Sequence, residues 1–123
     1  ALTVWDLAQG HSTIANNGVK NTLHMVSKVL DSNNKDMYNA PSNGTKVFDA
    51  NDCALVQKAM QGTTTYGTAA GTSSMLGRPV AGKSGTANDE MASSFVGYTP
   101  SMMNVWAIWN PDISAMYLRK NMV

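Results

Sequence analysis

One short run of residues, GRPVAGKSGT at 77 to 86, groups a lysine, two hydroxyl side chains and three glycines closely enough to bind an anion. Taken as Gly-x-x-x-x-Gly-Lys-Ser, the run satisfies the pattern of a P-loop, whose backbone amides and lysine hold the phosphates of a nucleotide. Taken from Lys83 onward, the same residues form an extended segment whose ammonium and hydroxyl groups could bind a carboxylate. The flanking residues decide between these two interpretations.

The flanks do not favour a P-loop. A P-loop needs an apolar strand before its first glycine and a helix that begins at the Lys-Ser pair. Here GTSSML precedes Gly77, and GTAND follows Ser84, so glycine and turn-forming residues stand where the first turns of the helix should be. Pro79 also removes one amide from the loop. We therefore retain a P-loop nucleotide-binding protein only as a minor alternative.

The carboxylate interpretation treats the lysine and hydroxyls as parts of one strand. Lys83, Ser84 and Thr86 are expected to place their ammonium and hydroxyl groups along one side of an extended edge strand. In an ideal strand we expect Ser84 to face away from Lys83 and Thr86, so either the strand twists or only part of the set contacts the ligand. Gly85 permits close approach of a ligand or a neighbouring backbone. A bound carboxylate would gain charge-assisted hydrogen bonds of about 1.5 to 3 kcal/mol each. The competing interpretation is an edge strand with surface hydroxyls and no ligand.

Helix signals occur in two places before this run. Thr3 and Asp6 form a capping box, and the apolar spacing after them predicts a helix that the Asn16-Asn17-Gly18 run ends. Asp49 is predicted to cap a second helix that ends at Gly62. The residues predicted near one face of that helix are Ala50, Leu55, Val56, Ala59 and Met60.

The remaining segments predict extended structure and loops. Residues 22–30, followed by the polar turn DSNNKD at 31–36, indicate a hairpin or a strand with a loose return, and residues 62–77 indicate a long loop. Three strands are then predicted within RPVAGKSGTA, SSFVGYTP and MNVWAIW, joined by short turns typical of an antiparallel meander. ISAMYLRKNMV at 113–123 could be helical. The expected fold class is α+β, with an antiparallel sheet at the C-terminal end and helices packed on it.

The composition limits the function classes. The chain has 123 residues, the size of one domain, with 43% hydrophobic and 14% charged residues. A net charge of +1 gives no basic surface for nucleic acid, so no nucleic-acid partner is expected. The single Cys53 is assigned to packing, and His11 on the first helix and His24 in a strand are assigned structural roles. No third ligand lies at metal spacing, and we expect no metal and no cofactor.

The longer run GRPVAGKSGTANDEMASSFVGYTP resembles the transpeptidase domain of class A penicillin-binding proteins. In that family a strand beginning Arg-Pro-Val-Ala-Gly-Lys-Thr-Gly-Thr precedes a second strand reading Phe-Val-Gly-Tyr-Thr-Pro, and this chain has both in register. LTVWDLAQGHSTIANNGV is similar to a family helix, and QKAMQGTTTYGTA resembles the helix and Gly-Thr loop that lead to the motif strand. The resemblance covers residues 2 to about 110, and its most specific part is Lys83 to Pro100.

The resemblance implies roles for four residues. Ser84 and Thr86 would bind the terminal carboxylate of a peptidoglycan stem peptide ending in D-Ala-D-Ala, or that of a β-lactam, with Gly85 between them. Lys83 would supply positive charge and help the catalytic proton network. The backbone amide of Thr86 would form half of an oxyanion hole, which stabilises the tetrahedral intermediate. Lys83 and Thr86 are therefore the expected catalytic residues, and Lys83, Ser84, Gly85 and Thr86 the expected substrate-binding residues.

The family's reaction also needs a serine nucleophile in Ser-x-x-Lys and a second Ser-x-Asn element. Ser32-Asn33-Asn34-Lys35 matches both patterns, but it lies in a predicted polar turn, and we interpret the match as coincidental. Residues 1–123 are thus expected to be the C-terminal portion of a single transpeptidase domain whose nucleophile-bearing portion is absent. The chain alone should form no acyl-enzyme, and the remainder of the domain is an expected partner.

Two further expectations follow from the resemblance. Such proteins act at the extracytoplasmic face of the bacterial membrane, held by an N-terminal helix that this chain does not contain. A non-catalytic cell-wall peptide-binding or scaffold module remains an alternative, which binding of D-Ala-D-Ala without acylation would favour.

Overall fold

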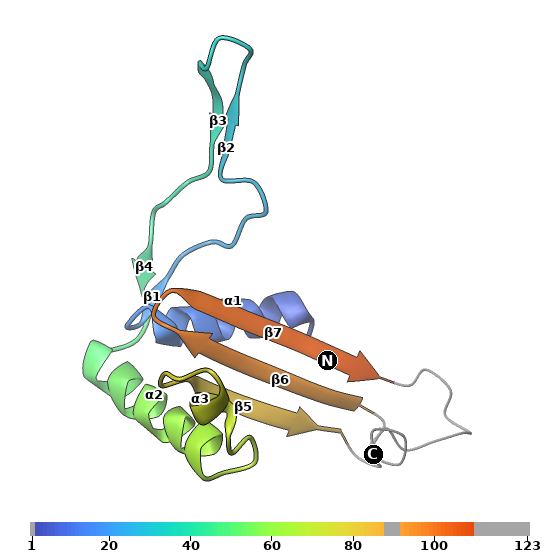
Figure 1. Ribbon diagram of the computed structural model, residues 1–123. Coiled ribbons are helices and arrows are strands. Elements are labelled where there is room, and N and C mark those ends of the chain that lie inside the picture. The colour runs from blue at the N-terminus through green and yellow to red at the C-terminus, as the bar shows by residue number, and fades with distance from the viewer. Residues whose placement is uncertain (1, 88–91, 110–123) are drawn as a thin grey trace.

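The computed structural model describes residues 2–87 and 92–109 and arranges them as a helix-covered sheet from which a hairpin projects (Figure 1). The helices are α1 (Val4–Ala15), α2 (Ala50–Thr65) and α3 (Thr72–Met75). The strands are β1 (Val19–Lys20), β2 (Lys28–Leu30), β3 (Asp36–Asn39), β4 (Thr45–Lys46), β5 (Ala81–Thr86), β6 (Ala92–Thr99) and β7 (Met102–Trp109). The predicted α+β class is confirmed.

The main sheet is an antiparallel meander in the order β5-β6-β7, as predicted. Lys83 pairs with Val96, which in turn pairs with Val105. The turn between β6 and β7 lies at Thr99 to Ser101, where the Thr99 hydroxyl approaches the Met102 carbonyl oxygen at 3.5 Å. Most of the predicted ANDEM connection, residues 88–91, lies outside the described residues, as does the predicted C-terminal helix at 113–123.

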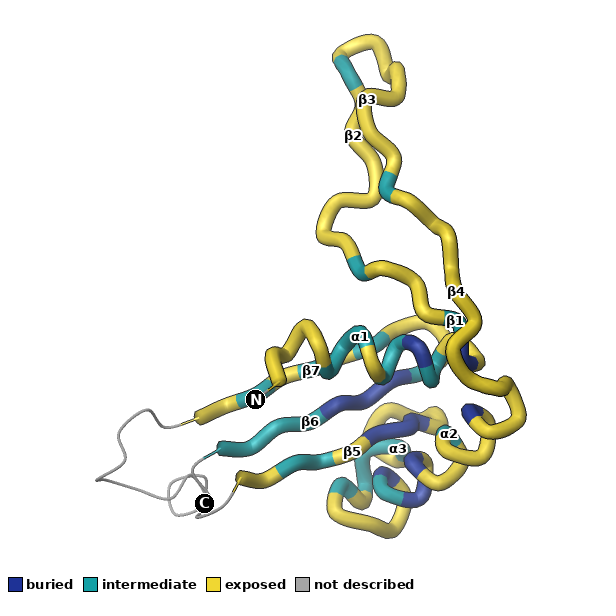
Figure 2. The backbone as a smooth tube through the Cα atoms, turned by 180° about the vertical axis from the view of Figure 1, so that it is seen from behind, coloured by how far each residue is buried: buried dark blue, intermediate teal, exposed yellow. Residues whose placement is uncertain are grey.

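The core lies between one face of this sheet and the first two helices (Figure 2). Directly paired residues share a face, and Ala81 pairs with Tyr98. The buried members of the cluster are Met60, Ala81, Val96 and Tyr98, with Leu7, Ala15, Met103 and Val105 packed against them. Contacts run from α1 to β6 and β7, and from α2 to β5. The two helices therefore cover the same face of the sheet.

Helix α1 begins and ends where the sequence predicts. The Thr3 hydroxyl accepts from the Asp6 amide at 3.1 Å, and Asp6 accepts from the Thr3 amide at 2.9 Å, which completes the capping box. At the other end, Asn17 and Gly18 take left-handed conformations with φ of 53° and 85°. A residue with such a φ ends a helix because the backbone no longer continues the α conformation.

The predicted N-terminal cap of α2 is confirmed, but its predicted end and part of its predicted inner face are wrong. The Asp49 carboxylate accepts from the Asn51 amide at 2.8 Å. The helix continues through Gly62 to Thr65, because the Gly62 carbonyl oxygen still accepts from the Tyr66 amide at 2.9 Å and closes another turn. Its buried residues are Cys53, Met60, Gly62 and Thr64, whereas Leu55 and Val56 from the predicted face are 68% and 44% exposed. Small and polar residues thus make most of its inner surface.

The predicted loop at 62–77 is shorter than expected. The last four residues of α2 and the short helix α3 occupy much of it, because each segment closes its own backbone hydrogen bonds. The predicted burial of Cys53 is confirmed at 3% exposure.

Two small ribbons complete the described chain. Strands β2 and β3 form the predicted hairpin, although only Lys28–Leu30 of the predicted 22–30 strand is paired. His24, predicted in a strand, lies in an exposed irregular segment. Strand β1 pairs with β4 where the chain leaves the helices and runs out to the β2–β3 hairpin.

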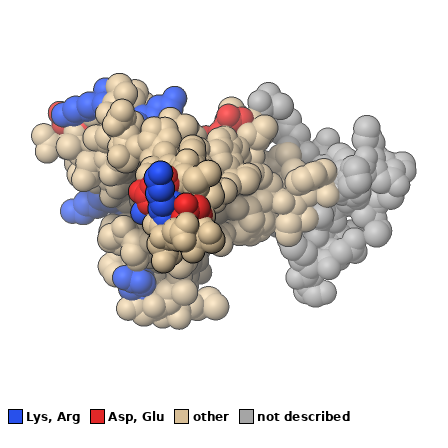
Figure 3. Space-filling view, turned by 90° about the horizontal axis from the view of Figure 1, so that it is seen from above, with Lys and Arg blue, Asp and Glu red and all other residues tan. Residues whose placement is uncertain are grey.

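The surface carries few charges. Figure 3 shows lysine, arginine and aspartate side chains scattered over a face that is otherwise neutral, with both signs gathered near its middle. Among the described residues, no helix is long and apolar enough to cross a membrane.

Candidate functional site

The predicted site residues lie together on β5, but on opposite faces of it. Lys83 and Gly85 pair with Val96 and Ser94 and share the face that the helices cover. Ser84 and Thr86 lie on the other face. This corrects the expectation that the ammonium and hydroxyl groups share one side and that Ser84 faces away from Thr86, because side chains two residues apart in a strand point the same way.

The backbone of β5 turns its free hydrogen-bonding groups outward at the same two residues. Ala87 donates to the Ala92 carbonyl oxygen at 2.9 Å, so every second residue counted back from Ala87 pairs its amide with β6. Ser84 and Thr86 fall between those residues. Their amide and carbonyl groups therefore point away from β6, at the outer edge of a strand that no described strand covers.

Side chains from two elements meet at this edge. The hydroxyl groups of Thr68 and Ser84 lie 2.5 Å apart, which ties the segment after α2 to the motif strand. The exposed Lys83 ammonium donates to the Ser84 carbonyl oxygen at 2.5 Å, so the lysine reaches the outer edge although its Cα lies on the helix-covered side. Sequence reasoning missed Thr68, whose only signal was its place in the Gly-Thr loop. Together these groups offer two hydroxyls and one cation to an anion.

A pair of glycines, one on β5 directly before Lys83 and one on β6, keeps the two strands in close contact. Gly82 pairs directly with Gly97, and the Phe95 ring lies over both of them. A methyl group on Gly97 would come within 2.5 Å of the Phe95 ring. One on Gly82 would come within 2.9 Å of both that ring and the Val96 carbonyl oxygen. The aromatic ring fills the space that the glycines leave and fixes the register of the motif strand.

The start of β5 is held by a buried hydroxyl. Thr64, which is fully buried, donates to the Val80 carbonyl oxygen at 2.5 Å and contacts the Ser73 hydroxyl at 3.0 Å. Ser73 in turn accepts from the Val80 amide at 3.2 Å. The end of α2 and the short α3 thus fix the backbone position from which the motif strand begins.

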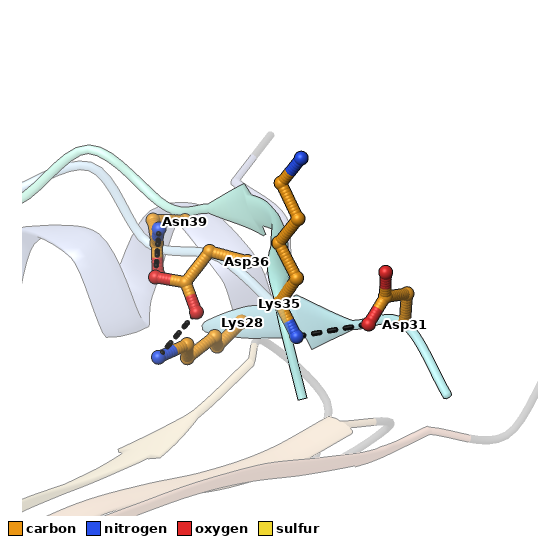
Figure 4. A network of polar contacts seen from close by, with 5 residues as sticks. All are labelled: Lys28, Asp31, Lys35, Asp36 and Asn39. Carbon is orange, nitrogen blue, oxygen red and sulfur yellow. Dashed lines mark hydrogen bonds and ion pairs between the residues drawn. The ribbon is translucent and has the colours of Figure 1, made fainter. Parts of the chain in front are cut away.

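The Ser-Asn-Asn-Lys match lies in the hairpin turn, as predicted. The Asp31 carboxylate accepts from the Asn33 amide at 2.8 Å and from the Lys35 amide at 2.9 Å, which closes the turn. Figure 4 shows the Lys35 side chain pointing away from Asp31. Ser32 and Lys35 are exposed, on a ribbon that belongs to a different sheet from β5. The structure brings neither residue to the motif strand.

The same geometry contradicts the P-loop alternative. Lys83 and Ser84 lie in the middle of a strand that continues to Thr86, so no helix begins at the Lys-Ser pair. A P-loop binds phosphate through the amides at such a helix start. In the described part of the chain, no three His, Cys, Asp or Glu side chains gather closely enough to hold a metal ion.

His11 packs within the helical layer. Its Nδ1 atom is buried and has no hydrogen-bond partner in the described structure. Burial lowers the pKa of His11 because the protonated ring would lose its hydration. The histidine lies on α1 and forms no hydrogen bond with the motif in the described structure, which agrees with the structural role predicted for it.

Comparison with known proteins points to one family. A family model described as the penicillin-binding protein transpeptidase domain matches residues 1–110. Penicillin-binding protein 1A of Neisseria flavescens is 31% identical over 102 residues, which are 79% of this chain and 13% of that protein. Penicillin-binding protein 4 of Bacillus subtilis is 29% identical over 119 residues, 95% of this chain and 19% of that protein. The chain therefore spans less than a fifth of the length of these relatives.

Solved structures show the same relationship. The D,D-transpeptidase domain of a peptidoglycan glycosyltransferase from Eggerthella lenta superposes with a TM-score of 0.68 at 31% identity, over 80% of this chain and 24% of that domain. Penicillin-binding protein A from Mycobacterium tuberculosis, solved as an imipenem acyl-enzyme, superposes with a TM-score of 0.69 at 19% identity, over 86% of this chain and 25% of that protein, and shares the fold. This chain belongs to the penicillin-binding protein transpeptidase domain family.

Proposed function

We propose that this chain supplies the carboxylate-binding and oxyanion-hole strand of a serine D,D-transpeptidase. In the whole enzyme, a serine attacks the D-Ala-D-Ala bond of a peptidoglycan stem peptide, releases D-alanine and passes the acyl group to an amine of a neighbouring stem peptide. A β-lactam acylates the same serine. The site would lie at the extracytoplasmic face of the bacterial membrane.

The outward edge of β5 is the observation that carries this proposal. The Thr86 amide points away from β6, where it can donate to an oxygen that becomes negatively charged in the transition state. The Ser84 and Thr86 hydroxyls share one face beside that edge, and the Lys83 ammonium reaches it. One extended strand can therefore hold a ligand carboxylate with its hydroxyls while its amide stabilises the reacting carbonyl.

Lys83 and Ser84 each contact groups of this chain that a ligand carboxylate could replace. Lys83 donates to the backbone of its own strand, and Ser84 contacts Thr68. A carboxylate docked at this edge would take over hydrogen bonds from both residues, and its bond to the ammonium would be charge-assisted. The substrate-binding roles of Lys83 and Ser84 rest on this exchange of partners, and that of Gly85 rests on its place between Ser84 and Thr86 in the strand.

The nucleophile is proposed to lie in the remainder of the domain. The only serine spaced as Ser-x-x-Lys is Ser32, and the hairpin turn holds it apart from β5. Because this chain spans 24% of the Eggerthella lenta domain, we propose that the remaining portion is the partner that completes the site. On this account residues 1–123 form no acyl-enzyme alone.

A chimeric enzyme tests the role of the strand. Residues 2–109 of this chain would replace the matching segment of Bacillus subtilis penicillin-binding protein 4, and acylation would be followed with a fluorescent penicillin after denaturation. We expect labelling of the chimera, and a loss of at least about tenfold in acylation rate for Lys83→Met and for Thr86→Val, since each removes a charge-assisted contact. Lys35→Met is the matched control, because it removes an exposed lysine from the hairpin turn.

The outcomes separate the candidate functions. A chimera that folds, as judged by its melting transition, but is not acylated would contradict the transpeptidase assignment. If that chimera still bound D-Ala-D-Ala, the result would favour the non-catalytic wall-binding module. Equal acylation of the wild-type and Lys83→Met chimeras would remove Lys83 from the site.

A further inference from the structure

A polar cavity lies at the start of β5, on the N-terminal side of Lys83 to Thr86. It encloses about 570 Å³ between the end of α1, the middle of α2 and the start of β5, a volume within the range of sites for small molecules. Ala81, the first residue of β5, lines it, and Thr86 lies five residues further along the strand. At about 3.3 Å per residue the two places are roughly 17 Å apart. None of residues 83–86 lines the cavity, which is therefore distinct from the outer edge of β5 at Ser84 and Thr86.

Arg78 is the only charged residue among those that line the cavity. The Arg78 amide donates to the Ser73 carbonyl oxygen at 3.2 Å, and Pro79 follows, so the backbone that carries the guanidinium is fixed. An arginine fork matches the two oxygens of a carboxylate and can bind both at once. This charge distribution selects an anionic ligand.

Carboxamide side chains line the same cavity. Gln57 and Gln61 lie one helical turn apart on α2 and so face the same way. The Gln57 amide nitrogen donates to the Ile14 carbonyl oxygen at 2.8 Å, which holds α2 against the end of α1 and leaves the Gln57 side-chain oxygen as an acceptor. Asn17 completes the group from the left-handed turn after α1. Carboxamides both donate and accept, which is the pattern that pairs with peptide groups.

The remaining walls are small and apolar. Pro79, Pro100 and Ala15 border the cavity, and the Tyr98 ring forms part of it while its hydroxyl is turned to the Met60 sulfur at 3.6 Å. These apolar surfaces suit small apolar side chains of a ligand. The cavity thus combines an arginine, carboxamide side chains and small apolar surfaces. A ligand that suits all three has a carboxylate, peptide groups and small side chains.

We propose that this cavity, the Arg78 pocket, binds a short peptide or peptide tail through its free terminal carboxylate. Arg78 holds the carboxylate, Gln61 and Asn17 pair with the adjoining peptide groups, and the proline and alanine surfaces contact small side chains. The tail of a wall peptide and the C-terminus of a protein share this chemistry. The proposal does not rest on the catalytic role of β5.

Residue-resolved NMR on the ¹⁵N-labelled 123-residue chain tests the proposal. The probes are N-acetyl-L-Ala-L-Ala, N-acetyl-D-Ala-D-Ala and the C-terminal amide of each. We expect at least one of the acids to shift the signals of Asn17, Gln61 and Tyr98 saturably, and its amide to bind at least about tenfold more weakly, since the amide cannot form the charge-assisted pair with Arg78. The preferred stereochemistry then identifies a protein tail or a wall peptide as the source.

Variants make the test decisive. Arg78→Gln should weaken binding by at least about tenfold, and Gln61→Ala, on an exposed helix surface, should weaken it less. Lys58→Gln is the matched control, because it removes a neighbouring exposed cation from α2 that does not line the pocket. Thr86→Val should leave pocket binding unchanged, which separates this site from the proposed catalytic edge.

Three results would overturn the proposal. These are equal binding of acid and amide, wild-type binding by both Arg78→Gln and Gln61→Ala, and shifts confined to residues 83–86. Melting curves of each variant show whether it is folded. If Arg78→Gln does not fold, the acid-to-amide comparison on the wild-type chain decides the question.

Discussion

Two regions of this molecule combine a lysine with a serine, and they differ in everything around those residues. The motif strand β5 lies against a buried neighbour strand, is held at its start by the buried Thr64 hydroxyl, and turns the amides of Ser84 and Thr86 to an open edge. The β2–β3 hairpin carries Ser32 and Lys35 on an exposed turn that the Asp31 carboxylate closes. The comparison shows that a four-residue pattern is informative only where the surrounding packing fixes its geometry.

Substitutions in the two regions should also differ in their effect on the stability of the chain. A two-stranded ribbon is marginally stable on its own, so a change in the hairpin should stay local. A change under β5 should reach the whole helix-covered sheet, because the core residues Ala81, Val96 and Tyr98 belong to the same strands. Substitutions in each region can sharpen this contrast or break it.

The largest effect is expected where β5 and β6 are closest. Gly82→Val should destabilise the chain by about 3 kcal/mol, because even a methyl group would lie 2.9 Å from the Val96 carbonyl oxygen and the Phe95 ring. The matched control is Gly10→Ala on the exposed side of α1, where an added methyl group meets no atom within 4 Å. That change should stabilise by about 0.5 to 1 kcal/mol. Chemical denaturation measures both, and similar effects of the two substitutions would contradict the close packing at Gly82.

The second largest loss of stability is expected when the buried Thr64 hydroxyl at the end of α2 is removed. Thr64→Val should cost about 1 to 3 kcal/mol, because the Val80 carbonyl oxygen loses its donor in a buried place. Thr65→Val is the neighbouring control, since the Thr65 hydroxyl is exposed and bonds only to the Gln61 carbonyl oxygen. Thermal unfolding of the two variants tests this. If Thr65→Val lowered the melting temperature as much, the buried hydrogen bond would not explain the loss.

The sheet region should also lose stability at mildly acidic pH. Burial lowers the pKa of His11 in the folded state. Its neutral ring therefore contributes fully to the free energy of unfolding above the ordinary pKa of 6.5, and this contribution is lost as the pH falls through the lower folded pKa. His11→Gln should therefore flatten the fall in melting temperature between about pH 7.5 and pH 5. The exposed His24, substituted in the same way, serves as the control. A steep fall that persists in the His11 variant would require another titrating group.

The smallest effect is expected in the hairpin. The Lys28 ammonium lies 2.7 Å from the Asp36 carboxylate and, together with Asn39, lowers the pKa of Asp36. These contacts stabilise the hairpin above the ordinary Asp36 pKa of 3.8, and the stabilisation is lost as the pH falls through the lower folded pKa. Lys28→Gln should raise the pKa of Asp36, measured by NMR titration, and leave the global melting temperature unchanged. A global loss of stability would show that the hairpin belongs to the cooperative unit.

Much of the fold could be predicted because it depends on local signals. The Thr3–Asp6 capping box, the Asp49 cap and the three alternating strands each depend on residues close together in the sequence. The inner face of α2 could be predicted only at Cys53 and Met60. Tertiary packing also buries Gly62 and Thr64 and leaves Leu55 exposed, which the spacing does not indicate. For the same reason the sequence located Lys83 to Thr86 on a strand but missed Thr68, which reaches Ser84 from sixteen residues away.

We infer that the motif strand is one wall of an acyl-transfer site and that its nucleophile does not lie in the hairpin. Incubation of the 123-residue chain with a fluorescent penicillin, followed by denaturation and mass mapping, tests it most directly. We predict no fluorescence on the denatured chain and no change in its mass. A covalent adduct mapped to Ser32, or to any other serine of the chain, would contradict the account.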